Sequence, residues 1–528
     1  MKHISNGFAV PTFWGTARGV LVGAGTAIAC LPGVAQAAAA GAAWSATADQ
    51  PLGIEVVAPV SAPMAFAASE LARYLGRILG RPIAVGTAAP GRPRILIEKV
   101  VDSAPMGDES YEIRAEGNTL RLRAGGDPGA VFGVYEFLRR YGGCRFSGLG
   151  PDGELVPTAQ RVTADGLPLR MRPKLWYRAP NFFRRGARTE WRGRYTDEES
   201  TRLCVEWLDW LVKNGLNYLM YTRDIDEEWF ARAMLPEVRK RGVKLDFDNH
   251  NLRRWLPPER YFADHPEWFP MVDGKRVARC EQLSMCTSNQ GAVQAVIENV
   301  KAFLRAHPEM SVVGVMPEDG HGMCHCDACT RLDVANGIDP QEQYRKVAFA
   351  QEGKGNRALR RRYTLLVNQV ARAVREEFPD VLIASAGYVD LTAPDPEIPL
   401  ESNTVVWIAL FGCDGARPIS AESPSKVNRL FYNTMEQWLT RTRGKVVAFS
   451  YTMGMSTQCS LPYSMDRVLV DVWKNLKALG IQGAGMHQRP EDHEVYALNV
   501  LAVLRSAWQD DVDPDALLDE YLEGMYGS

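Results

Sequence analysis

The stretch Val312-Val313-Gly314-Val315-Met316-Pro317-Glu318-Asp319-Gly320 is the best starting point for interpreting this chain. A short run of β-branched residues that ends at proline and glycine is typical of a buried strand. Two adjacent carboxylates, Glu318 and Asp319, follow directly. If the strand belongs to a parallel barrel, these acids lie at its C-terminal end, where barrels carry their active sites. The same acids could instead cap the next helix or hold the loop, because structural ion networks also collect carboxylates.

Strand and helix patterns alternate on both sides of this stretch. Candidate strands lie at residues 175–177, 218–221, 244–247, 312–316, 381–385, 404–410, 445–450 and 483–486. Candidate helices lie at residues 229–241, 290–306, 363–378, 465–479, 496–508 and 514–526, and another follows a capping box at Thr196 and Glu199. About eight strand–helix units predict an α/β fold, a (β/α)8 TIM-like barrel with enlarged loops. A doubly wound open sheet is the alternative, but no glycine-rich phosphate loop follows any of these strands.

A small α/β sandwich domain is expected before the barrel. Strand patterns at residues 54–57, 82–85, 94–98, 111–115 and 119–123 accompany helix patterns at 63–79 and 129–141. The Gly117-Asn118 pair is a hairpin signal between the last two strands. We therefore divide the chain into a signal peptide at 1–37, a small domain at 38–167 and a barrel at 168–528.

The first residues are typical of a bacterial secretory signal peptide. Lys2 and Arg18 precede a mostly apolar stretch that ends in the small-x-small sequence Ala35-Gln36-Ala37. A membrane anchor is disfavoured, because the apolar part is short and rich in glycine and alanine. We expect a periplasmic or secreted protein with no membrane span after signal cleavage.

Composition argues against several classes of partner. A formal net charge of −2 over 528 residues provides no basic surface for nucleic acid. The 13 tryptophans and 18 tyrosines would suit carbohydrate faces, although most such side chains fill cores. We expect no cofactor and no nucleic-acid partner, and the sequence does not fix the oligomeric state.

Cysteines gather at Cys324, Cys326 and Cys329. A disulfide is the natural expectation in an exported protein. A structural zinc site would need a fourth ligand, which Cys280 or Cys286 could supply. A catalytic metal is not expected, because the cluster lacks the histidine-rich open geometry of such sites.

Polar and aromatic residues follow the predicted strands and would meet at one mouth of a barrel. They are Asp224, Asp226, Asp248, His250, Glu318, Asp319, Tyr388, Asp414, Tyr451, His487, Gln488, Glu491 and Asp492. Trp407, within the predicted strand at 404–410, is a further candidate for substrate binding. Cleavage of a glycosidic bond needs an acid that protonates the leaving oxygen and a second group at the anomeric centre. Glu318 is the candidate general acid, and Asp319 would orient the substrate or stabilise developing charge. The reverse assignment stays open.

Four stretches of the chain resemble a known family of exported bacterial proteins. They are residues 129–138 with 143–146, residues 265–269 with 273–276, residues 285–289, and the acidic pair leading into residues 324–329. That family joins a hexosaminidase/α-glucuronidase-type N-terminal domain to a barrel long labelled a domain of unknown function. It includes endo-β-N-acetylglucosaminidases that process complex N-glycans. The resemblance implies a β-N-acetylglucosaminidase-like glycoside hydrolase that acts on a glycan.

The chain departs from the family pattern at three places. An Asn–Asp pair is common where Glu318-Asp319 stands, an acid is common at Ser450, and an acid–Gln pair is usual at His487-Gln488. A 2-acetamido group on the substrate could act as the nucleophile in place of a missing carboxylate.

Two alternatives remain open. One is a glycosidase for a different sugar, for instance a uronic acid, whose carboxylate would pair with Arg223, Arg253 or Arg254. The other is a glycan-binding barrel without catalysis.

Overall fold

The computed structural model describes residues 42–86, 91–100, 106–181, 196–220, 222, 225–248, 250–344, 356–452, 464–488 and 493–527. The predicted signal peptide lies outside the described residues, as do Arg223, Asp224, Glu491 and Asp492. Of the helices that are described, none combines the length and the apolar character needed to cross a membrane. The division of the chain at residues 37 and 167 stays a prediction.

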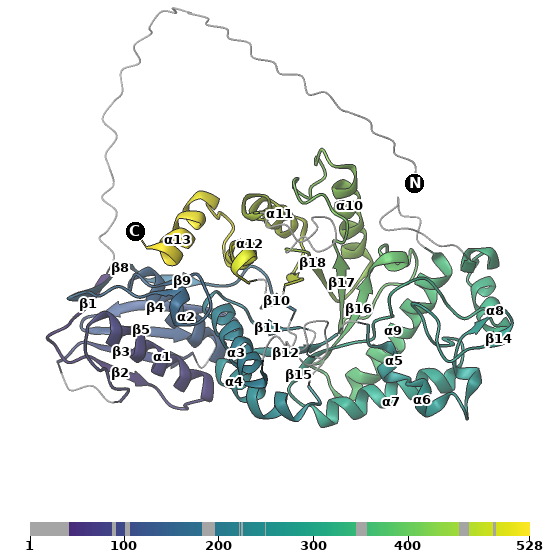
Figure 1. Cartoon of the computed structure of the whole chain (residues 1–528), viewed down its shortest axis with the longest axis horizontal. Helices are drawn as coiled ribbons and strands as arrows, with labels where there is room; N and C mark the ends of the chain where they lie inside the picture. Colours follow the sequence, from purple (N-terminus) through teal and green to yellow (C-terminus); the bar gives the residue numbers. More distant parts are fainter. Residues whose placement is uncertain are drawn as a thin grey trace, which may run out of the picture. The chain divides into compact units, whose positions relative to one another are not determined.

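The first sheet has the strand order β2-β3-β5-β4-β9. Its strands are β2 (Gly53–Val56), β3 (Arg94–Lys99), β5 (Thr119–Ala124), β4 (Tyr111–Glu116) and β9 (Leu169–Met171). Two helices, α1 (Ala62–Ile78) and α2 (Asp127–Arg140), accompany this sheet (Figure 1). Four of the five predicted strands are confirmed, whereas residues 82–85 form only an isolated bridge between Val85 and Ile54. Two short pairs flank the sheet, β1 (Ala42–Thr47) with β8 (Arg161–Leu167) and β6 (Arg145–Phe146) with β7 (Glu154–Leu155).

The second sheet is the predicted parallel barrel. Its strands are β10 (Tyr177–Pro180), β11 (Tyr218–Leu219), β12 (Lys244–Phe247), β15 (Met310–Gly314), β16 (Leu382–Gly387), β17 (Thr404–Ala409), β18 (Lys445–Ser450) and β19 (Gly483–Met486). Each pairs in parallel with its neighbour in the order β10-β19-β18-β17-β16-β15-β12-β11. An isolated parallel bridge between Asn181 and Met220 joins the first and last strands, so the barrel is nearly closed.

Helices connect most of the barrel strands. They are α3 (Asp197–Lys213), α4 (Leu235–Arg241), α7 (Gln290–Ala306), α9 (Arg357–Glu377), α10 (Lys426–Arg441), α11 (Asp466–Leu479) and α12 (His493–Trp508), and α13 (Pro514–Tyr526) follows the last of them. The predicted capping box is present at the start of α3, where the side chains of Thr196 and Glu199 bond reciprocally to each other's backbone.

One of the eight expected strand–helix units lacks its helix. The connection from β16 to β17 contains only a short 3-10 turn, Val389–Leu391, among the described elements. Pro394, Pro396 and Pro399 lie in this connection. Proline removes a backbone donor and clashes with the preceding helical turn, so this segment cannot continue as a helix.

Strand β15 ends at Gly314, two residues earlier than predicted. Beyond it, the backbone of Met316 turns toward Asn251, whose side chain accepts from the Met316 N–H at 3.0 Å and whose own N–H donates to the Met316 carbonyl at 3.1 Å. The Val315 N–H still donates to the Ala384 carbonyl of β16 at 3.0 Å, whereas these Met316 groups bond to a loop, so the chain has left the sheet by Met316.

A long excursion separates β12 from β15. It contains α5 (Leu252–Trp255), α6 (Pro258–Tyr261), the small hairpin of β13 (Met271–Val272) and β14 (Lys275–Arg276), and then α7. After β15, a second loop leads into α8 (Asp327–Ala335). These two loops carry most of the polar groups described below.

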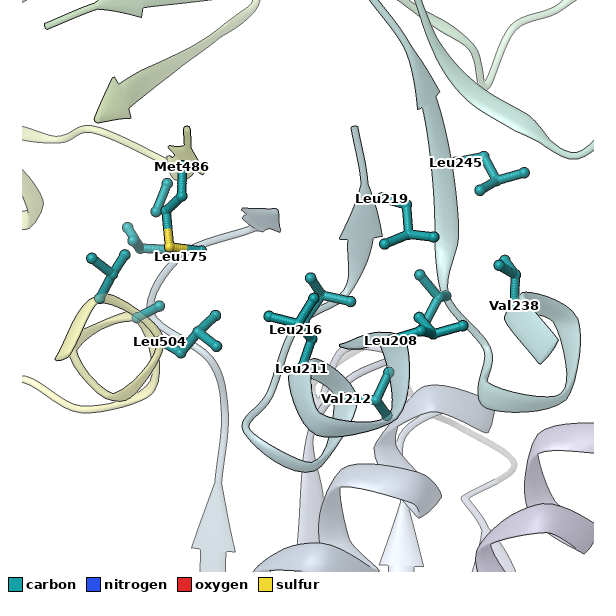
Figure 2. Close-up of a cluster of buried hydrophobic side chains, with 14 of the residues drawn as sticks. Leu175, Leu208, Leu211, Val212, Leu216, Leu219, Val238, Leu245, Met486 and Leu504 are labelled. Atoms are coloured by element: carbon teal, nitrogen blue, oxygen red, sulfur yellow. The ribbon is translucent and has the colours of Figure 1, made fainter. Parts of the chain in front are cut away.

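Buried leucines lie between the barrel strands and the helices behind them. Figure 2 shows Leu208 and Leu211 of α3 beside Leu219 of β11, with Val238 of α4 and Leu245 of β12 nearby. All five side chains are at most 1% exposed. Their burial holds the strands in the register that places their C-terminal ends around one opening.

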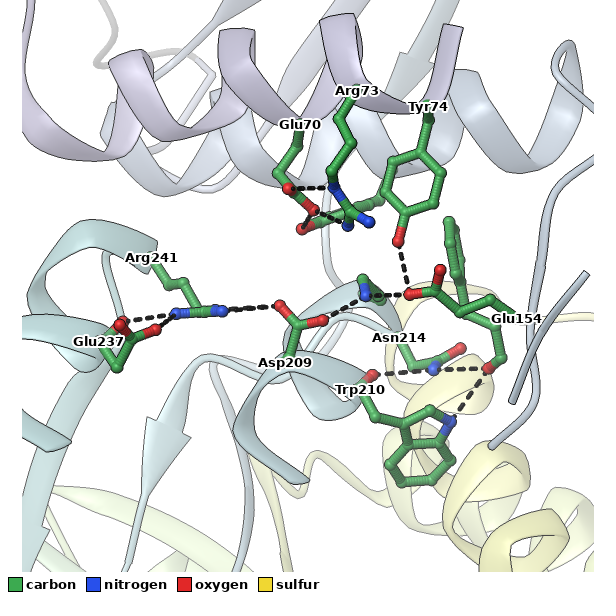
Figure 3. A network of polar contacts seen from close by, with 12 residues as sticks. Glu70, Arg73, Tyr74, Glu154, Asp209, Trp210, Asn214, Glu237 and Arg241 are labelled. Carbon is green, nitrogen blue, oxygen red and sulfur yellow. Dashed lines mark hydrogen bonds and ion pairs between the residues drawn. The ribbon is translucent and has the colours of Figure 1, made fainter. Parts of the chain in front are cut away.

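A polar network links the first sheet's helix α1 to the barrel helix α3 (Figure 3). Lys213 donates to Glu154 at 2.6 Å and also pairs with Asp209. Tyr74 donates to the same Glu154 at 2.6 Å, and Arg241 pairs with Asp209 at 2.7 Å. Buried charges need such partners, so these pairs hold helix α1 of the first sheet against helix α3 of the barrel.

Candidate active site

A cavity of about 300 Å³ lies at the C-terminal ends of the barrel strands. It is lined by Met220, Asp248, His250, Gln282, Met316, Pro317, Glu318, Asp319, Ala386, Tyr388, Trp407, Ala409, Phe411, Phe449, Tyr451 and His487. The predicted site residues from Asp248 to Gln488 that the structure describes all line this cavity, except Asp414 and Gln488. This is the end of a parallel barrel at which active sites form.

The acidic pair enters the cavity from the loop after β15. The Glu318 N–H donates to the Gln282 carbonyl at 2.9 Å, and the Gln282 N–H donates to the Asp319 carbonyl at 3.2 Å. Gly320 then turns the chain with a φ of +102°, a conformation that side chains rarely adopt. The chain has thus left the strand before the acids, which lets both carboxylates line one cavity, as the sequence suggested.

The two carboxylates have different surroundings. Glu318 accepts from Arg253 Nη2 at 2.9 Å, and its side chain is 13% exposed. The Asp319 side chain is 71% exposed, and its Oδ1 lies 3.3 Å from His250 Nε2. Glu318 therefore has an arginine partner, whereas Asp319 has an imidazole partner and faces solvent.

His250 is held in a fixed orientation beside Asp319. Its Nδ1 lies 2.7 Å from the Pro317 carbonyl oxygen, which can only accept a hydrogen bond. Nδ1 must then carry hydrogen, which leaves Nε2 facing the Asp319 carboxyl group. The backbone of His250 has a φ of +39°, an uncommon value for a residue with a side chain and one that clusters at functional sites.

Tyr388, at the end of β16, completes this group. Burial, and then the charge of Asp319 and its hydrogen bond, raise the pKa of Tyr388 to about 12. The phenol therefore keeps its proton at neutral pH and acts as a donor.

A second pair of acids lies deeper in the barrel. Asp246 is fully buried and accepts from the Tyr177 hydroxyl at 2.8 Å. Burial, and then the charge of Asp248, raise the pKa of Asp246 well above its ordinary value. Asp248, 2% exposed, forms part of the cavity wall. Sequence reasoning named Asp248 alone, although residues two apart on a strand point to the same face.

Aromatic rings form the far wall of the cavity. Tyr451 stacks on His487 with ring centroids 5.5 Å apart, and Phe411 meets Tyr451 edge to face at 5.3 Å. Burial raises the pKa of Tyr451 above its ordinary value. Trp407 packs edge to face on Tyr177 at 4.6 Å beneath them. Phe411 was missed in the sequence because single aromatic residues usually belong to cores.

Asp414 and Gln488 lie elsewhere. The backbone of Asp414 is bound by Asn428, and its carboxylate accepts from Ala416 N–H at 3.0 Å, which makes it part of a turn. The Gln488 side chain is fully buried against Thr452 at 3.2 Å. Ser450 donates to the Gly485 carbonyl at 3.2 Å within the barrel. Asp226 pairs with Arg254 and His307, away from the cavity lining.

A second, more open cavity of about 660 Å³ adjoins the first. It is lined by His250, Arg253, Arg279, Cys280, Glu281, Glu318 and Asp319. Three of these residues, His250 and the two acids, line both cavities. The acidic pair thus lies where an enclosed aromatic cavity meets an open polar one.

Gln282 is the residue of this site that sequence reasoning missed most clearly. It is 2% exposed, lines the enclosed cavity and has a φ of +57°. Its side-chain oxygen is buried without a hydrogen-bond partner among the described residues. Nothing in the local sequence marks it, because it reaches the site through a loop far from the end of any barrel strand.

The predicted cluster of Cys324, Cys326 and Cys329 is present, and it contains a fourth cysteine. Cys286 lies with Cys324, Cys326 and Cys329, and all eight described cysteines are free thiols. The disulfide expected for this cluster is therefore not formed among the described residues.

Comparison with protein families gives one match. The family described as "Domain of unknown function (DUF4838)" matches residues 149–528. A comparison with curated proteins found no match.

Solved structures with similar folds are glycoside hydrolases by their descriptions. A family GH115 4-O-methyl-α-glucuronidase has a TM-score of 0.57 and 11% identity, over 92% of this chain and 60% of that one. A GH138 enzyme targeting pectin rhamnogalacturonan II has a TM-score of 0.51 and 12% identity, over 88% and 51%. The β-N-acetylhexosaminidase from Bacteroides fragilis has a TM-score of 0.52 and 11% identity, over 91% of both chains.

This chain therefore spans about half to three fifths of the length of the first two proteins. At such low identity the likeness shows the barrel fold and nothing finer.

Proposed function

The chain belongs to the DUF4838 family, whose description gives no activity, and we propose that its barrel is a glycoside hydrolase. The observation that carries this proposal is the position of Glu318 and Asp319, at the junction of two cavities on the C-terminal face of the barrel. More specifically, we propose β-N-acetylglucosaminidase-like cleavage of a glycan with participation of the substrate's 2-acetamido group.

The two cavities suit the two sides of a glycosidic bond. The enclosed cavity, with its aromatic and methionine lining, can bury the C–H faces of a sugar ring and an acetamido methyl group. The open polar cavity can receive the rest of the glycan. A chain lying through both would place its bond beside the acids that line both.

The contacts of His250 support Asp319 as the proton donor. With hydrogen on His250 Nδ1, its Nε2 faces Asp319 Oδ1 at 3.3 Å, so a proton can pass between these two groups. In the proposed mechanism this proton goes to the leaving oxygen. Glu318, paired with the Arg253 guanidinium, is suited to act as a carboxylate. This assignment reverses the one favoured in the sequence.

The proposed reaction balances without a protein nucleophile. The Asp319–His250 pair gives its proton to the glycosidic oxygen as the bond to the anomeric carbon breaks. The acetamido oxygen bonds to that carbon, while Glu318 accepts a hydrogen bond from the acetamido N–H. Water then attacks the anomeric carbon and breaks its bond to the acetamido oxygen, and a proton from the water returns to the Asp319–His250 pair.

Two departures from the family pattern support participation by the substrate. Ser450 and His487 stand where carboxylates are common, and Ser450 is directed to a backbone carbonyl. The only carboxylates among the described residues that line the enclosed cavity are Asp248, Glu318 and Asp319. Asp248 lies at the buried end of the cavity, so a nucleophile from the substrate fits this lining better.

A uronic-acid substrate is the second candidate, and the arginines of the open cavity favour it. Arg253 and Arg279 both line that cavity and could pair with a carboxylate. However, no lysine or arginine occurs among the described residues that line the enclosed cavity. Arg254 pairs with Asp226 outside both cavities. A neutral acetamido sugar therefore suits the enclosed cavity better.

The test is hydrolysis of an aryl β-N-acetylglucosaminide, an aryl glucuronide and a complex N-glycan. The wild type is compared with Glu318→Gln and Asp319→Asn, because both changes keep shape and remove the carboxylate. Turnover of the complex N-glycan, whose leaving group needs protonation, should fall at least about a hundredfold in both variants. Turnover of the glucuronide alone would contradict the acetamido proposal. Glycan binding by all three proteins without turnover of any substrate would contradict catalysis altogether.

A further inference from the structure

We propose that Cys286, Cys324, Cys326 and Cys329 bind one zinc ion as a structural tetrathiolate site. The four sulfur atoms lie within 4.8 Å of one another, although Cys286 stands far from the other three in the sequence. All four residues are buried, with exposures of 0–4%. The proposal does not depend on the proposed function.

The spacing of the sulfur atoms matches a tetrahedral zinc site. Cys286 Sγ lies 3.7 Å from the Sγ atoms of both Cys326 and Cys329. Four thiolates bound to Zn²⁺ at about 2.3 Å occupy the corners of a tetrahedron with edges of about 3.8 Å. The thiols are therefore already arranged for the ion, and each would lose its proton to solvent as its Zn–S bond forms.

Hydrogen-bond donors surround the sulfur atoms. The Met271 N–H donates to Cys324 Sγ at 3.3 Å, and the Ser288 hydroxyl donates to Cys329 Sγ at 3.2 Å. Arg276 Nη1 lies 3.6 Å from Cys324 Sγ. Donors of this kind stabilise metal-bound thiolates and orient them. A cluster that served only as apolar packing would not need them.

A second guanidinium lies against the cluster. Arg362 is 1% exposed and donates to the Cys324 carbonyl at 2.6 Å, while its other nitrogens pair with the buried Asp333. Four thiolates exceed the charge of one zinc ion, so the site would be anionic. Positive side chains beside it offset the cost of burying that charge.

The ion would join the two loops that form the candidate active site. Cys286 ends the segment that contains Gln282, and the other three ligands follow the acidic pair. Backbone bonds already pair these segments: Leu283 N–H donates to the Gly322 carbonyl at 3.1 Å, and His325 N–H donates to the Met271 carbonyl at 2.8 Å. The zinc site would lock this pairing and thereby hold Glu318 and Asp319 at the barrel mouth.

The test is the metal content of the whole protein, purified without chelators and under reducing conditions. About one zinc per chain is expected for the wild type. Cys286→Ser should lower the zinc content more than about tenfold, because it removes a ligand. Cys280→Ser is the matched control: its thiol donates to the Leu283 carbonyl in the same loop, outside the cluster, and zinc should be retained.

A measurement on the wild type keeps the proposal testable if Cys286→Ser does not fold. Cobalt(II) exchanged into the protein should give the intense visible absorption of a tetrahedral thiolate complex. Absence of metal from wild-type protein grown with zinc, iron in its place, or full zinc retention in soluble Cys286→Ser would each overturn the assignment. The readout is independent of turnover, so a failure of the proposed hydrolase activity would not affect it.

Discussion

Replacing Arg178 with methionine should destabilise the protein strongly. Arg178 lies in β10 and is fully buried. It donates to the Gly215 carbonyl at 2.7 Å, to the Leu175 carbonyl at 2.8 Å and to the Glu109 carboxylate at 2.7 Å. Methionine fills much of the same volume but donates to none of these acceptors. The variant therefore leaves a carboxylate in a largely buried position without its cation.

Removing one partner of a buried ion pair costs about 3–5 kcal/mol. Glu109 keeps a hydrogen bond from Asn217 at 2.7 Å, so we expect the lower half of that range. In a chain of 528 residues, with an unfolding entropy of about 2 cal/mol/K per residue, such a loss should lower the thermal unfolding midpoint by about 3–4 °C. The measurement is thermal unfolding followed by circular dichroism at constant protein concentration.

The matched control is Arg170→Met. Arg170 makes an ion pair with Glu112 at 2.8 Å, but its side chain is 75% exposed. Exposed pairs contribute about 0–1 kcal/mol, so this variant should unfold within about 1 °C of the wild type. Equal shifts in the two variants would refute the reasoning, because only Arg178 is buried and only its loss leaves three buried acceptors without their donor.

Three further outcomes are expected. Burial raises the pKa of Glu154, but Lys213 and other hydrogen-bond donors outweigh burial and hold the folded pKa below the ordinary 4.5. Because the folded pKa is lowered, the free energy of unfolding should fall as the pH drops below about 4.5. The thermal midpoint of Glu154→Gln should therefore depend less on pH in that range than the midpoint of the wild type. Gly485→Ala should destabilise by about 1–3 kcal/mol in urea titration, because its Cβ would lie 2.9 Å from the Trp407 ring, and an unchanged midpoint would contradict this packing. Tyr388→Phe should lower kcat on an acetamido substrate by about 10- to 150-fold, the value of a hydrogen bond to a charged group, whereas an unchanged kcat would exclude a role for the hydroxyl.

Several elements of the barrel could be predicted from the sequence residue by residue, whereas helix α10 (Lys426–Arg441) was not predicted. Strands Lys244–Phe247, Lys445–Ser450 and Gly483–Met486 and helix Gln290–Ala306 have the predicted bounds. Their apolar periodicity is a local property, so tertiary contacts did not need to be known. The absence of a helix between β16 and β17 was also predictable, because Pro394, Pro396 and Pro399 lie in this connection.

The site could be predicted only where residues follow strands. Glu318, Tyr388, Tyr451 and His487 were found because the ends of parallel strands converge. Gln282 reaches the same region through a loop whose path depends on backbone pairing with residues 318–325. Such pairing joins segments far apart in the chain and leaves no periodic signal in either of them.

The roles of the two acids are tested most directly by how turnover depends on the leaving group. Kinetics of Asp319→Asn and Glu318→Gln are measured on two aryl β-N-acetylglucosaminides, one with a good leaving group and one with a poor one. A variant without its proton donor should lose turnover mainly on the poor leaving group, which needs protonation, whereas loss of the carboxylate that orients the acetamido group should affect both substrates. We predict the first pattern for Asp319→Asn and the second for Glu318→Gln. The opposite pattern would exchange the two roles, and wild-type turnover in both variants would contradict catalysis by this pair.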